Sequence, residues 1–167
     1  MRAPTETVRV VPEPYESEGP RWLVAQAEAE LIARYGGLDA GALGLTAAMF
    51  EPPHGSFLVA RVDGGQAVSP QRPVGGAGLR SVAQGIGEVR RLWVDPSRRG
   101  RGVGRALMVQ LECSALELGV QRLVLATGDG QPEAVQLNET TGWTRLYVDP
   151  EGKPLAAGWI RFAKTVG

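Results

Sequence analysis

The segment from Val89 to Met108, VRRLWVDPSRRGRGVGRALM, constrains the fold more than any other part of this chain. An apolar strand pattern ends at Val94, Asp95-Pro96-Ser97 interrupts it, and a run of arginine and glycine follows. From Gly102 to Leu118, apolar residues recur at steps of three and four, which is typical of a helix with one buried face. The sequence therefore predicts a strand, a glycine-rich turn and a long helix in direct succession.

The start of that helix is expected to bind an anion. The first four N–H groups of a helix have no intrahelical partner, and the helix dipole adds partial positive charge there. Glycines remove side chains that would hold a ligand away from the backbone, and arginines add charge-assisted contacts. The residues that form this set of donors, suited to a pyrophosphate, are Arg98, Arg99, Gly100, Arg101, Gly102, Gly104 and Arg105.

Two other phosphate-binding loops do not fit this segment. A Walker loop ends in Lys followed by Ser or Thr, whereas Gly104 is followed by Arg105-Ala106. A dinucleotide-binding loop has glycines at G-x-G-x-x-G after the first strand of its unit. Here the glycines are spaced by twos, and the loop follows the fourth predicted strand.

The rest of the chain predicts a mixed α/β domain that spans residues 1–167. The predicted helices are Arg21–Tyr35, Gly102–Leu118 and Pro132–Thr141, with a further short one around Ala42–Phe50. The strand around Arg122–Thr127 is short and apolar, which favours burial on both faces. The other predicted strands are Thr7–Val11, Ser56–Val62, Val74–Val82, Gly87–Val94, Trp143–Val148 and Trp159–Val166.

The hexapeptide Arg99-Gly100-Arg101-Gly102-Val103-Gly104 matches R-x-x-G-x-G and resembles the acyl-CoA signature of the GNAT N-acetyltransferase superfamily. Its flanks extend the resemblance, which is continuous from about Gly75 to Val166 and faint over the first third of the chain. EVRRLWVDP resembles the family's fourth strand, RALMVQLECSALELGVQRLVLAT its third helix and fifth strand, and PEAVQLNETTGW its fourth helix. The resemblance implies a mixed, mostly antiparallel twisted sheet of six to seven strands with helices on both faces.

The resemblance also implies acetyl-CoA as co-substrate, with its pantetheine arm between the fourth and fifth strands. The arm would pair with the backbone of the fourth strand, and the pyrophosphate would lie on the glycine-rich loop. Neither a metal nor a nucleotide cofactor is suggested. The residues expected to contact acetyl-CoA are Leu92, Trp93, Val94, Arg99, Gly100, Arg101, Gly102, Val103, Gly104, Arg105, Gln131 and Asn138.

Members of this family transfer the acyl group directly to an amine in a ternary complex. The amine must lose a proton before it can attack. Glu88 stands where many members carry a glutamate that faces the acceptor, so we expect it to assist this proton transfer. Alternatively, Glu88 is a strand-end carboxylate paired with Arg80 or Arg90. Asn138 stands where many members have a tyrosine that protonates the departing thiolate, and asparagine can donate only a hydrogen bond to sulfur.

Other departures from the family pattern leave the function open. Ala126 replaces a glutamate of some members, and Gln131 an often-seen asparagine. A small-molecule amine is the expected acceptor. A non-catalytic acyl-CoA-binding module and an acetyltransferase of protein N-termini or lysines are the alternatives. Tyr147 could serve as the acid, although a packing role is the better interpretation.

Composition and the N-terminal sequence limit the expected partners and location of the protein. Eighteen basic residues balance eighteen acidic ones, so overall charge favours neither nucleic acid nor a membrane surface as a partner. The N-terminal residues contain no signal-peptide pattern, and a cytoplasmic location is expected. Pairing through the last strands is common in the family, so a homodimer is one arrangement the resemblance allows.

Three further positions have ordinary interpretations beside functional ones. Cys113 is the single cysteine and is expected in the helix core. His54, the single histidine, is expected to be a solvated loop residue that could also serve an acceptor pocket. Met49 and Phe50 fit an acceptor pocket and a one-sided buried helix equally well.

Overall fold

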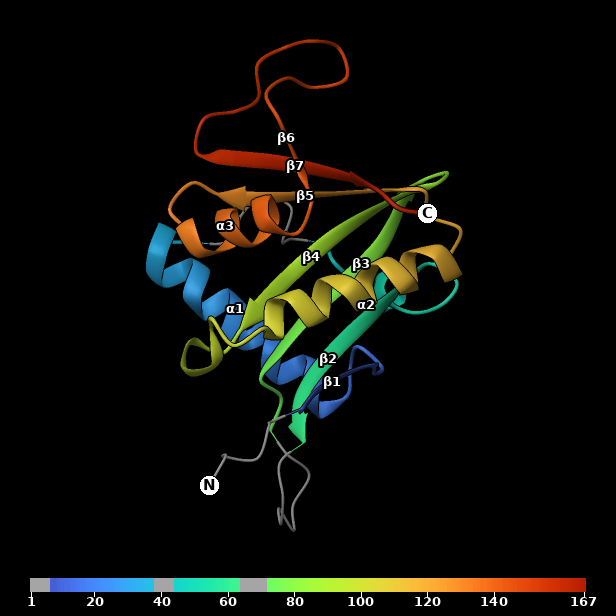
Figure 1. The fold of residues 1–167 in the computed structure, drawn as a ribbon, viewed down its shortest axis with the longest axis vertical. Helices are drawn as coiled ribbons and strands as arrows, with labels where there is room; N and C mark the ends of the chain where they lie inside the picture. The colour runs from blue at the N-terminus through green and yellow to red at the C-terminus, as the bar shows by residue number, and fades with distance from the viewer. Residues whose placement is uncertain (1–6, 38–43, 64–71) are drawn as a thin grey trace.

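The computed structural model describes residues 7–37, 44–63 and 72–167, and it is built on one sheet with the strand order β1-β2-β3-β4-β5-β7-β6 (Figure 1). All neighbouring strands are antiparallel except β4 and β5, which are parallel. The mixed, mostly antiparallel sheet is therefore confirmed. The strands are β1 (Thr7–Pro12), β2 (Gly55–Asp63), β3 (Gly75–Ala83), β4 (Ile86–Val94), β5 (Arg122–Gly128), β6 (Thr144–Leu146) and β7 (Trp159–Thr165).

Helices cover both faces of this sheet. On one face, Leu107 and Leu111 pack against β2 and β3 residues such as Leu58 and Leu79. The opposite face carries Leu23, which packs with Phe57 and other aromatic side chains. Figure 1 shows α2 and α1 on opposite sides of the strands. The helices are α1 (Glu18–Tyr35), α2 (Val103–Glu117) and α3 (Pro132–Thr140), with short 3₁₀ turns η2 (Ala47–Phe50) and η3 (Pro96–Arg98).

The pairing of β4 with β5 stops early. Only Ile86, Gly87 and Glu88 pair with β5, whereas β5 pairs with β7 along its whole length. Beyond Glu88, the two strands diverge and split the sheet into two arms (Figure 1). The divergence leaves one edge of β4 without a neighbouring strand among the described residues, between the two strands where the family resemblance implies the pantetheine arm.

A β-bulge in β4 accompanies the divergence. Gly78 pairs with Arg90 and Gly76 with Trp93, so that Arg91 and Leu92 together face the single residue between those two glycines. Arg91 has a φ of 57°, which is rare for a residue with a side chain. A bulge bends its strand and increases the local twist. The bulge therefore turns the second half of β4 away from β5.

The structure corrects the predicted burial of several residues. Cys113 is exposed on α2, because Leu111, Ser114 and Ala115 take the buried face. Tyr147 is 72% exposed and lies beyond β6, which is shorter than predicted. The strand β5 is not buried on both faces, since Ala126 is exposed where β4 has moved away.

Other elements follow the predictions closely. Phe50 is buried and stacks on Tyr15, which supports the one-sided interpretation of the segment before β2. Residues 42 and 43 of the short helix predicted there lie outside the described residues. His54 is exposed, as predicted. Among the described residues, no helix is both long and apolar enough to cross a bilayer.

Candidate functional site

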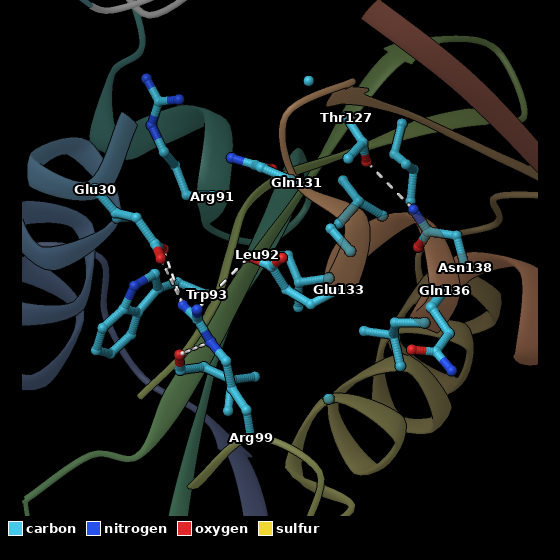
Figure 2. A pocket seen from close by; sticks show the side chains of 18 of the residues that line it. Glu30, Arg91, Leu92, Trp93, Arg99, Thr127, Gln131, Glu133, Gln136 and Asn138 are labelled. Carbon is cyan, nitrogen blue, oxygen red and sulfur yellow. Dashed lines mark hydrogen bonds and ion pairs between the residues drawn. The ribbon is translucent and has the colours of Figure 1, made fainter. Parts of the chain in front are cut away.

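A cavity of about 570 Å³ occupies the space between the diverging strands. Its walls come from β4 and β5, and its ends are formed by α1, α3 and the loop that precedes α2 (Figure 2). The lining includes Leu92, Trp93 and Val94 of β4, together with Gln131 at the N-cap of α3. A cavity beside an unpaired strand edge can accept an extended ligand that hydrogen-bonds to the backbone.

The loop between β4 and α2 is shaped by one cap and two glycines. The Asp95 carboxylate accepts hydrogen bonds from the backbone N–H and the hydroxyl of Ser97, at 2.8 and 2.7 Å. These bonds hold the pKa of Asp95 below its ordinary value. Gly100 and Gly102 then adopt left-handed conformations, with φ of 74° and 87°. The chain thereby reverses direction within a few residues and enters α2.

The first turn of α2 presents its backbone to the cavity. Gly102 is the N-cap and supplies no capping side chain, and the first helical hydrogen bond runs from the Ala106 N–H to its carbonyl. A Cβ placed on Gly100 or Gly102 would meet nothing within 4 Å. Because these glycines also line the cavity, the amides at this helix start are accessible to a ligand inside it.

Gly104 has a different role from the other two glycines of the loop. A Cβ at this position would lie 2.8 Å from a terminal methyl of Leu137. The glycine therefore lets α2 approach α3 closely, in addition to the ligand access expected from the sequence. Val103 is buried in the core beneath the loop.

Arg99 is held by protein groups on two sides. Its Nε donates to the Val94 carbonyl at 3.0 Å, and its Nη2 donates to both oxygens of Glu30 at 2.8 and 2.9 Å (Figure 2). The sequence predicts that Arg99 contacts the pyrophosphate, whereas in this structure its guanidinium points to α1. Arg99 thus fastens the loop to α1 and to the end of β4.

Glu30 and Arg99 belong to a larger ion-pair cluster, here defined as Glu30, Arg34, Arg99 and Glu133. The Arg34 guanidinium contacts Glu30 at 3.1 Å and Glu133 at 2.5 Å, and Arg99 lies 3.6 Å from Glu133. Burial alone would raise the pKa of Glu133, but the backbone N–H of Glu133 itself and the hydrogen bond and charge of Arg34 lower it overall. The cluster joins α1, the loop and α3 at the edge of the cavity.

Glu88 lies at the closed end of the cavity, where β4 and β5 still pair. Its Oε1 accepts a hydrogen bond from Arg80 Nε at 3.1 Å and one from Arg90 Nη1 at 3.4 Å. The ion-paired interpretation made from the sequence is therefore confirmed, and Glu88 also lines the cavity. Its role in proton transfer stays a prediction.

Asn138 lines the opposite wall and is only 1% exposed. Its Nδ2 donates to the Thr127 hydroxyl at 3.2 Å, as Figure 2 shows. Its Oδ1 is buried and has no hydrogen-bond partner among the described residues. Tyr147, the other residue considered as an acid, does not line this cavity.

Comparison with known families agrees with this geometry. Residues 11–143 match the acetyltransferase (GNAT) family. The chain belongs to the GNAT family. Its cavity between β4 and β5 is thus the cleft of a GNAT fold, and residues 99–104 lie within the matched segment.

Curated relatives match this GNAT chain over part of its length. It is 35% identical over 89 residues to an IAA acetyltransferase of Azospirillum brasilense, covering 52% of this chain and 53% of the relative. A 64-residue segment is 39% identical to a mycothiol acetyltransferase of Thermobispora bispora, covering 38% of this chain and 22% of that protein. The chain thus spans about half or less of the length of the curated relatives it matches.

Solved structures show the same fold over almost all of the chain. A candidate acyl-CoA N-acyltransferase from Klebsiella pneumoniae has a TM-score of 0.73 at 22% identity, covering 96% of this chain and 98% of its own. A GNAT acetyltransferase from Elizabethkingia anophelis with acetyl-CoA bound has a TM-score of 0.63 at 16% identity, covering 95% and 98%. At these identities, the two structures establish a common fold.

Sequence reasoning missed several residues at the GNAT cleft. Glu30 and Arg34 lie on α1, in the part of the sequence with the faintest resemblance, and their partners are far away in the chain. One local signal pointed to Glu133, because it is an acidic residue in the first turn of the helix that begins at Pro132. Thr127 had none, because a threonine in an apolar strand is an ordinary strand residue.

Proposed function

We propose that this GNAT chain transfers the acetyl group of acetyl-CoA to an amine of a small molecule by direct attack in a ternary complex. One observation carries the proposal: the accessible amides at the start of α2 open into a cavity that follows the unpaired edge of β4. A helix start binds a pyrophosphate and a free strand edge binds an extended amide chain. CoA contains both groups in that order.

The donor fits the cavity in one direction. Its pyrophosphate lies on the amides from Gly100 to Arg105, where the side chains of Arg101 and Arg105 add positive charge. The pantetheine arm then runs along Leu92, Trp93 and Val94 towards the point where β4 and β5 pair. The thioester comes to rest near the bulge in β4, and an N–H of that strand stabilises the oxyanion.

The chemistry requires one proton transfer before the attack. An alkylamine has a pKa near 10 and is mostly protonated at neutral pH. Glu88 accepts that proton, directly or through a water, while Arg80 and Arg90 hold its carboxylate in place. The amine nitrogen then forms the C–N bond to the acetyl carbon and gives up its second proton to solvent. The C–S bond breaks, and the departing thiolate takes a proton from solvent.

A small-molecule acceptor is supported by the relatives, whose names are those of an IAA acetyltransferase and a mycothiol acetyltransferase. Placing both substrates in one cleft supplies most of the acceleration through proximity and oxyanion stabilisation. A general base adds typically about 10²–10⁴-fold.

Two measurements test this function. Titration calorimetry should detect acetyl-CoA binding, and a thiol-release assay over a panel of small amines, peptides with free N-termini and lysine peptides should detect turnover. Turnover with small amines is the expected result. Binding without any turnover would support a non-catalytic acyl-CoA-binding module, and turnover confined to peptides would support a protein acetyltransferase. Failure to bind acetyl-CoA would overturn the proposal.

A further inference from the structure

The strands β3, β4, β5 and β7 contain one acidic residue, Glu88, and arginines lie around it on the same face of the sheet. Residues paired across neighbouring strands point to the same face, and so do residues two apart along one strand. Arg80 pairs with Glu88, and Arg90 follows Glu88 by two residues on β4. Their side chains therefore lie on the face opposite Val89, which packs with the core beneath α2.

A further arginine reaches this face from the other arm of the sheet. Glu88 pairs with Val124 of β5, and Ala126 lies two residues further along that strand. Arg161 of β7 pairs with Ala126, so its side chain also shares the face of Glu88. Ala126 lines the cavity and is exposed, and Arg161 is exposed beside it. Arg90 and Arg161 thus lie on either side of Ala126, one on each arm.

The charged side chains on this face can be reached from solvent. Glu88 and Arg90 line the cavity, and their side chains are 25% and 15% exposed. Arg161 forms no ion pair with a carboxylate of the described residues. Neighbouring strands are about 4.8 Å apart, which is less than the length of an arginine side chain, so Arg161 can extend over Ala126. A guanidinium carries five N–H donors, so Arg90 can contact a second anion while it stays paired with Glu88.

A carboxylate beside arginines is complementary to a substrate that carries both charges. The Oε1 atom of Glu88 lies 3.4 Å from Nη1 of Arg90. In a free amino acid one carbon separates the two charged groups, so that the nitrogen and the carboxylate carbon are about 2.5 Å apart. The ammonium group can therefore face Glu88 while the carboxylate contacts Arg90. Hydrogen bonds between a guanidinium and a carboxylate are among the stronger ones in proteins.

We propose that the acceptor is a free amino acid whose carboxylate binds Arg90 and Arg161 over Ala126 while its amine faces Glu88. This inference rests on the proposed function, and it names the acceptor class of that same site. Arg161 contacts the carboxylate and no reacting atom, so it determines specificity. A peptide N-terminus presents a neutral amide where a free amino acid has its carboxylate, and it therefore fits this face less well.

The experiment compares amino acids with their own amides. Thiol release from acetyl-CoA is measured with glycine, alanine, leucine and phenylalanine and with the four corresponding amino acid amides. For the side chain that is turned over fastest, kcat/KM should be at least about tenfold higher for the acid than for the amide, as expected for charge-assisted hydrogen bonds.

Substitution of Arg161 tests where the preference comes from. Arg161→Gln should lower the acid-to-amide ratio of kcat/KM about threefold to tenfold, mainly through KM of the acid, and Arg161→Lys should restore part of it. Arg145→Gln is the matched control. Arg145 is also exposed, but it pairs with Phe162, which packs with the core on the opposite face. Its acid-to-amide ratio should equal that of the wild type.

A binding measurement gives the same test without turnover. Calorimetry on CoA-saturated protein compares an N-acetyl amino acid, which is the reaction product, with its amide. The acid should bind more tightly, and Arg161→Gln should reduce the difference. Thermal melts show whether the variants fold. Should Arg161→Gln fail to fold, the comparison of acid and amide on the wild type decides alone.

Two results would overturn the inference: equal values for acids and amides, or an unchanged acid-to-amide ratio in folded Arg161→Gln. Turnover confined to neutral amines would also overturn it and would leave the proposed function intact. Wild-type protein that does not bind acetyl-CoA would overturn the proposed function itself, and a titration with acetyl-CoA alone distinguishes that outcome.

Discussion

Both carboxylate oxygens of Glu30 accept hydrogen bonds from Nη2 of Arg99, at 2.8 and 2.9 Å. This contact fastens α1 to the loop that precedes α2. The same arginine donates from Nε to the Val94 carbonyl, which fixes the loop to the last residue of β4. A carboxylate therefore stands beside the place where the proposed diphosphate binds. In the proposed complex the two anions compete for the positive charge of this loop.

This competition predicts that Glu30→Gln binds CoA more tightly than the wild type at low salt. The amide keeps the size of the side chain and removes one negative charge near the diphosphate, while Val94 still holds Arg99. For a partly exposed charge pair, the gain should be about twofold to fivefold. Calorimetry at low and at high ionic strength measures it, and the gain should shrink as salt screens the charges.

Glu117→Gln is the matched control for Glu30→Gln, because Glu117 is exposed at the far end of α2. It removes the same charge from the protein and should leave CoA affinity unchanged. Weaker CoA binding by Glu30→Gln would mean that the carboxylate serves mainly to anchor the loop.

The left-handed glycine at the start of α2 gives a second prediction. Gly102 has a φ of 87°, and Gly152, in a distant turn, has a φ of 83°. Neither has an atom within 4 Å of an added Cβ. Valine at either position should introduce a similar backbone strain of about 1–2 kcal/mol, because it must adopt a left-handed conformation. Gly102→Val should in addition lose CoA binding at least about tenfold, because its side chain covers the helix amides.

Thermal melts and CoA titrations of both glycine variants separate strain from lost contact. Both variants should melt earlier by similar amounts, and only Gly102→Val should lose affinity. Full CoA affinity in a folded Gly102→Val protein would refute the assignment of the loop as the diphosphate site.

The order of the elements and the position of the loop could be predicted from the sequence, because their signals are local. The apolar stripe from Val103 to Leu111 determines which face of α2 is buried, and those residues are buried as expected. The family resemblance added a place for an extended arm between the fourth and fifth strands, and the short pairing from Ile86 to Glu88 leaves such a space. No local pattern contains that information.

The burial of residues at the margin of an apolar sequence pattern was harder to predict. Cys113 lies seven residues after Ala106, which is itself only partly buried, so this position is at the margin of the buried face and is exposed. Ala126 continues an apolar run and yet is exposed, because a neighbouring strand departs. The exposure of a residue in β5 depends on where β4 goes.

The long-range contacts of the ion-pair cluster could not be predicted from the sequence. Arg99 and Glu30 are 69 residues apart, and Arg34 and Glu133 are 99 residues apart. With eighteen acidic and eighteen basic residues, the chain allows many such pairings. Only the fold brings these four side chains together, since α1, the loop before α2 and α3 meet at the edge of the cavity.

Glu88 gives the third prediction, which concerns catalysis. Glu88→Gln should lower kcat by about tenfold or more and change the pH profile of kcat, because an amide cannot accept the amine proton. CoA affinity should not change, since Glu88 lies at the closed end of the cavity, away from the helix start. Steady-state rates across a pH series, with calorimetry for CoA, test both statements.

Asp63→Asn is the control for Glu88→Gln. Asp63 is exposed at the end of β2 and pairs with Arg9 at 3.6 Å, outside the cavity lining. Its rate and pH profile should match the wild type. A Glu88→Gln enzyme with the wild-type pH profile would remove Glu88 from the role of base.

Asp95 gives the last prediction, which concerns stability against pH. Ser97 donates two hydrogen bonds to the Asp95 carboxylate, and they hold its pKa below the ordinary value of 3.8. The folded state therefore binds this proton less readily than the unfolded state, so the charged carboxylate stabilises the fold above about pH 3.8 and the contribution is lost as the pH falls through the lowered pKa. Asp95→Asn keeps an acceptor oxygen and removes the charge. The difference in free energy of unfolding between wild type and Asp95→Asn, measured by urea titration, should be largest near neutral pH and shrink in acid. Ser97→Ala removes one donor and should reduce this pH dependence, and a difference that stays constant from neutral to acid pH would contradict the role of the Asp95 charge.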